Sequence, residues 1–252
     1  MVEVLLDVRD LRIGATAYPP GEPPVDIEIV KGVSFTLEKG KVLGLIGESG
    51  AGKSTIGLAS MAYGRGGVRI TGGEVFLNGR DILKGGTAGL RALRGREVTY
   101  VAQSAAAAFN PAKTLMEQVI EATLRHELAP RAEAERHAVE LFTKLGLPDP
   151  ETFGRRYPHQ VSGGQLQRAM TAMALCPQPD LVVFDEPTTA LDVTTQIDVL
   201  ADQGGDPRYR GGRAIHHPRP GGGGPGFRPD HGAARRRDGG IRRDPADHRG
   251  PA

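Results

Sequence analysis

The sequence predicts an α/β fold: a largely antiparallel β section, an inserted helical part, and a return to a core of buried strands. Three observations support this prediction. Pro/Gly loops separate strand-like runs up to about residue 98, and the stretch from about 105 to 160 favours helices. Two apolar runs, 41–46 and 181–184, each stop abruptly at a polar motif, as buried strands of an α/β core do. A chain of 252 residues is long enough for one such core.

Composition agrees with a cytosolic protein. Residues 1–9 alternate in polarity like a strand and carry early acidic residues, so we expect no signal peptide. No run approaches the roughly 18 apolar residues of a membrane span. The net charge of +2 gives no reason to expect nucleic acid. Cys176 is solitary, and we expect a packed thiol in a reducing compartment.

A glycine-rich motif follows the first apolar run, 41–46, which we expect to be a buried strand. It reads Gly47-Glu48-Ser49-Gly50-Ala51-Gly52-Lys53-Ser54-Thr55 and matches the phosphate-binding P-loop pattern. The glycines let backbone N–H groups point at the β- and γ-phosphates of a nucleotide, and the following helix adds its positive end. We expect Lys53 to supply a point charge and Ser54 a Mg²⁺ ligand.

A second apolar run, Leu181–Phe184, ends in Asp185 and Glu186. Taken alone, this is more often a strand leading into a turn than a metal site. Beside a P-loop, a carboxylate at the end of a parallel strand is placed to hold Mg²⁺, and the next one to polarise an attacking water. We therefore assign the metal to Asp185 and the general base to Glu186, which makes ATP hydrolysis the working hypothesis.

Helix signals fill the region between these two motifs. Residues 114–127 and 131–146 are expected to be helical, the second ended by Gly146. Ser162-Gly163-Gly164-Gln165 precedes the helix-favouring run 166–175, so Ser162 is expected to be an N-cap. Free N–H groups and a hydroxyl at this helix start form a second surface suited to phosphate.

The order and spacing of these motifs resemble the ATP-binding subunits of ABC transporters, from about residue 3 to residue 200. The sequence around these motifs, such as Phe109-Asn110-Pro111 and Thr188–Ile197, is similar to that of the dipeptide, oligopeptide and nickel importer branch of the family. The resemblance implies a P-loop NTPase core over residues 1–201, with a helical subdomain at about 105–170. It also implies that ATP and Mg²⁺ are the cofactors.

The resemblance also implies roles for single residues. Gln103 matches the Q-loop glutamine, which touches Mg²⁺ and the attacking water. Ser162 to Gln165 match the signature, which completes the ATP site of the opposite protomer, and Asp192 matches the D-loop. An adenine-stacking aromatic is expected upstream of the P-loop, where Tyr18 is the candidate and a solvated loop tyrosine is the alternative.

The implied partners are a second ATPase subunit, identical or not, and transmembrane permease subunits that meet the helical part. An extracytoplasmic substrate-binding protein would act indirectly, and the chain would sit peripherally on the inner face of the cell membrane. Plain scaffolding is the alternative role for the helices. The transported substrate is not readable from this chain.

The character of the chain changes after residue 201. Residues 202–252 hold no Leu, Val, Met or Lys, but 13 Gly, 11 Arg and 7 Pro in 51 residues. Such a segment buries too little apolar surface to order itself, so we expect disorder. No strand and no switch histidine can be seen here, although the family has both after this point. One interpretation is a basic Gly/Arg tail that touches RNA or membrane.

We favour a frameshift. If codons start one base later, residues 216–234 can be back-translated to spell Ile-Thr-His-Asp-Leu-Ala-Val-Val-Ala-Gln-Val-Ser-Asp-Arg-Ile-Met-Val-Leu-Arg. That string resembles the switch-histidine strand of the family together with the next helix and strand. The histidine codon would then straddle Pro218 and Arg219, so His216 and His217 are not expected to be the switch. Three functions stay open: an importer ATPase, an ATP-binding but hydrolysis-defective product, and a soluble ABC ATPase.

Overall fold

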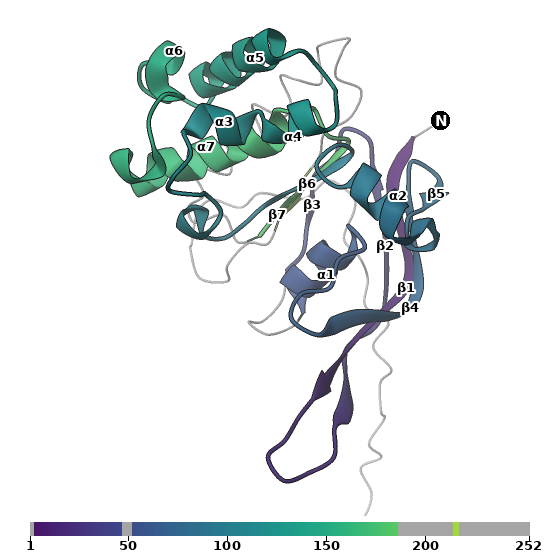
Figure 1. The fold of residues 1–252 in the computed structure, drawn as a ribbon. Coiled ribbons are helices and arrows are strands. Elements are labelled where there is room, and N and C mark those ends of the chain that lie inside the picture. The colour runs from purple at the N-terminus through teal and green to yellow at the C-terminus, as the bar shows by residue number, and fades with distance from the viewer. Residues whose placement is uncertain (1–2, 47–51, 186–213, 217–252) are drawn as a thin grey trace, which may run out of the picture.

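The computed structural model describes residues 3–46, 52–185 and 214–216, the last with backbone only. There, two sheets lie beside a group of helices (Figure 1). The strands are β1 (Val4–Ala17), β2 (Val25–Glu38), β3 (Leu43–Gly44), β4 (Val68–Leu77), β5 (Arg80–Asp81), β6 (Val98–Val101), β7 (Leu181–Phe184) and β8 (Ala214–His216). The helices are α1 (Lys53–Ala59), α2 (Gly86–Leu93), α3 (Leu115–Val119), α4 (Glu121–Arg125), α5 (Arg131–Lys144), α6 (Pro150–Phe153) and α7 (Gly163–Leu175). Short 3-10 turns cover Leu83–Gly85, Ala105–Ala107 and Pro158–Gln160.

The first sheet is antiparallel, in the order β2-β1-β4-β5, as expected for the N-terminal section. Its centre is β1, which pairs with β2 on one side and β4 on the other, with Val8 opposite both Phe35 and Val75. All three of these side chains are buried. The far end of the β1–β2 hairpin extends away from the rest of the molecule (Figure 1).

The second sheet is parallel, in the order β3-β8-β7-β6. Because side chains alternate across a strand, its two faces bury different residues. Tyr100 and Val183 face α1 and the antiparallel sheet, whereas Val101, Val182 and Phe184 belong to the apolar core around α7. The sheet therefore separates two cores, one on the side of α1 and one within the helical part.

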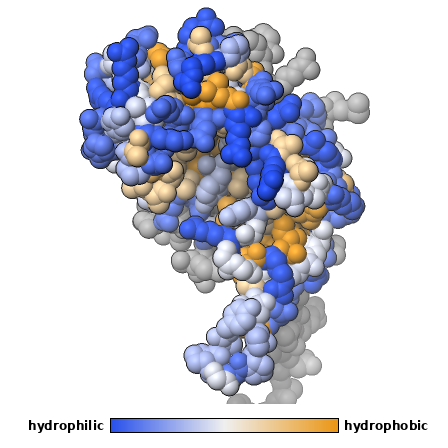
Figure 2. All heavy atoms as spheres, in the orientation of Figure 1, coloured by the Kyte–Doolittle hydropathy of each residue, from blue (hydrophilic) through white to orange (hydrophobic). Residues whose placement is uncertain are grey.

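The helical part agrees with the sequence predictions. Residues 114–127 form two short helices, α3 and α4, that meet at Ile120, and residues 131–146 hold α5. Gly146 follows α5 with φ at 63°, the left-handed conformation that glycine adopts at helix ends. The helix α7 lies at the centre of the helical part and buries eight of its residues. It packs against α3 and α5, and this contact closes the second core. In Figure 2, most of this part's visible surface is hydrophilic, with small separate orange patches.

One strand prediction was too long. Of the apolar run 41–46, only Leu43–Gly44 is a strand, and Ile46 is 80% exposed. The physical reason is position: β3 lies at the edge of the parallel sheet, and its partner β8 has three residues. A strand with one short neighbour cannot form the long ladder of a central strand.

A second prediction was wrong at three residues. We expected no strand after residue 201, but Ala214–His216 form β8 between β3 and β7, with Ile215 opposite both Leu43 and Val183. Parallel pairing on both sides satisfies the backbone groups of a short strand, and this offsets the poor composition around it. His216 lies opposite Gly44 in the ladder. The remainder of 202–252 lies outside the described residues.

Candidate functional site

The structure joins the two motifs that the sequence predicts to share a metal. Ser54, in the first turn of α1, donates its hydroxyl proton to Oδ1 of Asp185 over 2.7 Å, although 131 positions separate them. Asp185 directly follows β7, and its backbone N–H donates to the Val101 carbonyl of β6 over 2.9 Å. The carboxylate is therefore fixed at the end of the parallel sheet, beside the start of the helix that follows the glycine-rich motif.

A tyrosine that the sequence analysis missed completes this cluster. The Tyr100 phenol donates to Oδ2 of Asp185 over 2.5 Å. Partial burial, together with this hydrogen bond, raises the pKa of the Tyr100 phenol well above its usual range. No local sequence signal shows the contact, because it depends on the β6–β7 register, in which Tyr100 pairs with Val183, two residues before Asp185.

The chemistry of these groups fits Mg²⁺. The ion prefers hard oxygen ligands at about 2.0–2.1 Å and is commonly held by one or two carboxylates together with a nucleotide's phosphates. Ser54 Oγ and Asp185 Oδ1 are such oxygens, and at 2.7 Å they are close enough to be neighbours around one ion. The structure therefore brings two of the three predicted Mg²⁺ ligands, Ser54 and Asp185, into contact, and their role in holding the ion stays a prediction.

The start of α1 has the backbone that the motif requires. Gly52 precedes the helix with φ at 78°, and a Cβ there would lie 3.2 Å from Cγ2 of Val30. This position therefore favours glycine for its conformation and for its space. Lys53, Ser54 and Thr55 form the first turn of the helix. The earlier motif residues 47–51, together with Glu186 and Asp192, lie outside the described residues.

Gln103 lies two residues beyond β6 and is exposed. Its strand is the one that carries Tyr100 and pairs with β7, so the chain leaves the metal cluster through Gln103 towards the helical part. Its role towards Mg²⁺ and the attacking water stays a prediction.

The Ser162–Gln165 segment begins α7 as expected. The Ser162 hydroxyl accepts from the Gln165 backbone N–H at 3.3 Å, and the Gln165 side chain accepts from the Ser162 backbone N–H at 2.9 Å. This reciprocal pair is a capping box, which satisfies two N–H groups at the helix start. Ser162, Gly163 and Gly164 are exposed, so this helix start faces away from the core.

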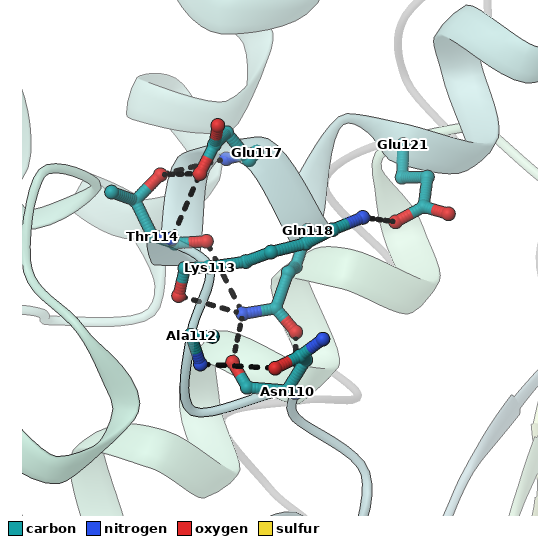
Figure 3. A network of polar contacts seen from close by, with 7 residues as sticks. All are labelled: Asn110, Ala112, Lys113, Thr114, Glu117, Gln118 and Glu121. Carbon is teal, nitrogen blue, oxygen red and sulfur yellow. Dashed lines mark hydrogen bonds and ion pairs between the residues drawn. The ribbon is translucent and has the colours of Figure 1, made fainter.

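The loop between Gln103 and α3 is held by one buried side chain (Figure 3). The Gln118 amide accepts from the Asn110 backbone N–H at 2.7 Å and donates to the Asn110 carbonyl at 3.1 Å. It also donates to the carbonyls of Lys113 and Thr114, at 3.1 and 3.2 Å. At 7% exposure, Gln118 fixes the 110–114 loop from inside the helical part.

Two other predictions concern single residues. Tyr18 lies in the turn between β1 and β2 and is 76% exposed, so its stacking on adenine stays a prediction. Cys176 is buried at the end of α7, which confirms a packed thiol. Burial raises the pKa of Cys176 to about 11, partly offset by the hydrogen bond that it accepts from Thr123.

Comparison with known proteins identifies close relatives in sequence. The dipeptide transport ATP-binding protein DppD of Bacillus subtilis is 36% identical over 203 residues, covering 79% of this chain and 58% of that protein. The oligopeptide transport ATP-binding protein OppD of Salmonella typhimurium is 39% identical over 197 residues, covering 78% and 57%. The metal-staphylopine import system ATP-binding protein CntD of Staphylococcus aureus is 39% identical over 196 residues, covering 78% and 69%. The chain thus spans little more than half the length of DppD and OppD.

Solved structures agree on the fold. The ATP-binding cassette MJ0796, in a dimeric post-hydrolysis state bound to ADP and Pi, superposes with a TM-score of 0.66 at 23% identity. The match covers 85% of this chain and 88% of that one. The family model described as ABC transporter matches residues 30–189, which hold the Ser54–Asp185 pair and the capped start of α7. The chain therefore belongs to the ABC transporter family.

Proposed function

We propose that this chain is the ATP-binding and ATP-hydrolysing subunit of a membrane ABC importer. The observation that carries the proposal is the hydrogen bond from Ser54 to Asp185, because it joins the glycine-rich motif to the acidic strand in one oxygen cluster. Both residues would hold Mg²⁺, which supplies positive charge against the nucleotide's phosphates. Lys53, at the first position of α1, adds a second positive charge at the same helix start.

Glu186, the residue after Asp185, would take a proton from the attacking water, and Gln103 would help to orient that water. The capped start of α7 would meet the nucleotide of a second, identical or different, ATPase subunit. Two such chains would then enclose two ATP molecules head to tail. In this arrangement Ser162 keeps its bond from the Gln165 N–H and still has a hydroxyl proton to donate to a phosphate.

The partners follow from the relatives. DppD, OppD and CntD are named for dipeptide, oligopeptide and metal-staphylopine transport, so we place this chain with permease subunits that import peptides or metal complexes. Nickel is the metal that the resemblance of the motifs implies. Among the described helices none is long and apolar enough to cross a membrane. The chain would bind the permease from the cytoplasmic face and meet the extracytoplasmic binding protein only through it.

Binding of a fluorescent ATP analogue to the full chain, with and without Mg²⁺, tests this proposal. Lys53→Ala should weaken binding by about one to two orders of magnitude, the scale of a charge-assisted hydrogen bond lost at the phosphates. Lys41→Ala is the matched control, because Lys41 is exposed and precedes the motif. Equal affinities for wild type and Lys53→Ala would contradict the assignment of the motif. Co-purification with permease subunits separates an importer from a soluble ABC ATPase.

The hydrolysis-defective product is the second candidate. It is favoured by the sequence after residue 201, where the Thr-His-Asp expected at the switch strand does not occur in this reading frame. A chain that binds the analogue but turns over no ATP would support it.

A further inference from the structure

Two hydroxyl groups from different elements hold the two oxygens of one carboxylate. The Asp185 Oδ1 atom accepts from Ser54 at 2.7 Å, and Oδ2 accepts from Tyr100 at 2.5 Å. Ser54 belongs to the glycine-rich motif, whereas Tyr100 lies three residues before Gln103 and has no role in the sequence predictions. The second contact therefore needs an explanation of its own.

Strand geometry shows that this contact is built into the sheet. Tyr100 and Val183 are opposite one another in the parallel β6–β7 pair, and Asp185 is two residues beyond Val183. Since side chains alternate with a period of two, Tyr100 and Asp185 project from the same face of the sheet. The Asp185 N–H also donates to Val101 on the same strand, so β6 holds both the backbone and the side chain of Asp185.

We propose that Tyr100 is a positioning residue of the nucleotide site, which fixes the Asp185 carboxylate so that Oδ1 faces Ser54 and the Mg²⁺ ion. An aspartate carboxylate rotates easily about its last torsion, whose distribution is broad. A phenol on Oδ2 and a hydroxyl on Oδ1 together select one orientation. The proposal rests on the proposed function, because it assigns a role towards the metal of that site.

The proposal distinguishes two contributions of one side chain. The Tyr100 ring packs against the core on the α1 side, beside Val183, and this contact would stabilise the fold whether or not metal binds. The hydroxyl, by contrast, touches Asp185. A positioning role therefore depends on the oxygen, whereas a packing role depends on the ring.

Tyr100→Phe tests this distinction, because it removes the oxygen and keeps the ring. Tyr63→Phe is the control, since Tyr63 packs its ring under the Arg94 guanidinium and is 41% exposed. For each full-length protein, Mn²⁺ binding is measured by electron paramagnetic resonance in the presence of a non-hydrolysable ATP analogue. The affinity for the analogue is also measured in excess chelator, and the melting temperature is recorded.

In Tyr100→Phe we expect the Mn²⁺ concentration at half-saturation, the midpoint, to rise about three- to tenfold. This is the scale of one hydrogen bond that is lost and partly replaced by water. Metal-free affinity for the analogue should stay at the wild-type value, and Tyr63→Phe should match wild type in both measurements. A purely structural role would change both affinities together or neither, so this split identifies positioning.

Tyr100→Leu supplies the second variant, because it removes both ring and oxygen. If the midpoint moves in Tyr100→Leu but not in Tyr100→Phe, the ring alone matters and the proposal is wrong. If the wild-type protein binds the analogue together with Mn²⁺, but the midpoint of Mn²⁺ binding is the same in Tyr100→Phe, then the role of Tyr100 is wrong and the proposed function stands. Wild-type protein that shows no metal-dependent binding overturns the proposed function, and the role of Tyr100 with it.

Discussion

The helices α1 and α7 both begin at motifs expected to meet phosphate, but they begin in opposite ways. At α7, Ser162 and Gln165 satisfy each other within four residues, and the helix buries eight residues in its own core. At α1, Gly52 precedes the helix without a side-chain cap, and the first-turn hydroxyl of Ser54 donates to Asp185 at the end of β7. One helix start is capped by its own residues, whereas a side chain in the first turn of the other is hydrogen-bonded to a distant part of the chain.

This difference implies that substitutions in the two motifs should affect different properties of the protein. A locally capped helix loses stability when its cap is removed, because the lost bonds belong to the fold. A helix start that is linked to a distant carboxylate should lose function when that link is changed, because we propose that the linked groups hold the metal of the nucleotide site. Four predictions follow, two on the nucleotide side and two on the helical part, in decreasing order of effect.

The first prediction concerns the reading frame. Removing one base near codons 200–203 should supply a strand ending in Thr-His-Asp and raise steady-state ATP turnover about 10²–10³-fold, the scale of one preorganised transition-state contact. Replacing the restored histidine with alanine is the control and should return turnover to the level of this chain. Equal turnover by this chain and the restored one, or a genomic read without Thr-His-Asp in any frame, would contradict the frameshift.

Glu186→Gln, made in the restored chain, should lower turnover by about two orders of magnitude or more, because it keeps the side-chain shape and removes the base. ATP should still bind, and ATP-bound dimers should accumulate in size-exclusion chromatography. Glu151→Gln, on α6 in the helical part, is the control. Turnover near wild type in Glu186→Gln would show that another group is the base.

Gln118→Leu should lower the free energy of unfolding by about 1–3 kcal/mol, because backbone groups of Asn110, Lys113 and Thr114 lose a part-buried hydrogen-bond partner. Glu121→Ala is the control in the same network, since its pair with Lys113 at 3.4 Å is exposed and worth about 0–1 kcal/mol. Urea denaturation measures both. Affinity for the ATP analogue should not change, and a parallel loss of affinity would show that the helical part and the nucleotide side are not independent.

Ser162→Ala should cost about 1 kcal/mol of stability, which lowers the melting temperature by about 2–4 °C. Ser162→Thr keeps the capping oxygen and should recover most of the loss. Analogue binding by the monomer should stay the same in both. A melting temperature unchanged by Ser162→Ala would mean that the capping box contributes little to the fold.

The sequence predicts best where a signal is local. The capped start of α7, the length of α5 and the buried run Leu181–Phe184 each follow from a few neighbouring residues. The link between Ser54 and Asp185 was also predictable, because two motifs of known chemistry imply a shared metal.

The features that the sequence could not predict depend on strand pairing. The phenol of Tyr100 reaches Asp185 only because β6 and β7 pair in one particular register. The strand β8 was missed because three residues, Ala214–His216, in a Gly/Arg/Pro-rich segment carry no periodic pattern. The length of β3 was overestimated because its ladder is limited by its short neighbour β8.

The alternation along β6 and β7 has a consequence for how such a protein can evolve. Tyr100 and Val183 pack on the α1 side of the sheet. The opposite side packs against the helical part through Val101, Val182 and Phe184, so each face has its own set of side chains. Because successive side chains of a strand point to opposite faces, a substitution on one face changes contacts that differ from those on the other. The helical face can therefore change to suit a different partner while selection keeps the opposite face constant. In this way one ancestral nucleotide-binding core can come to work with different partners.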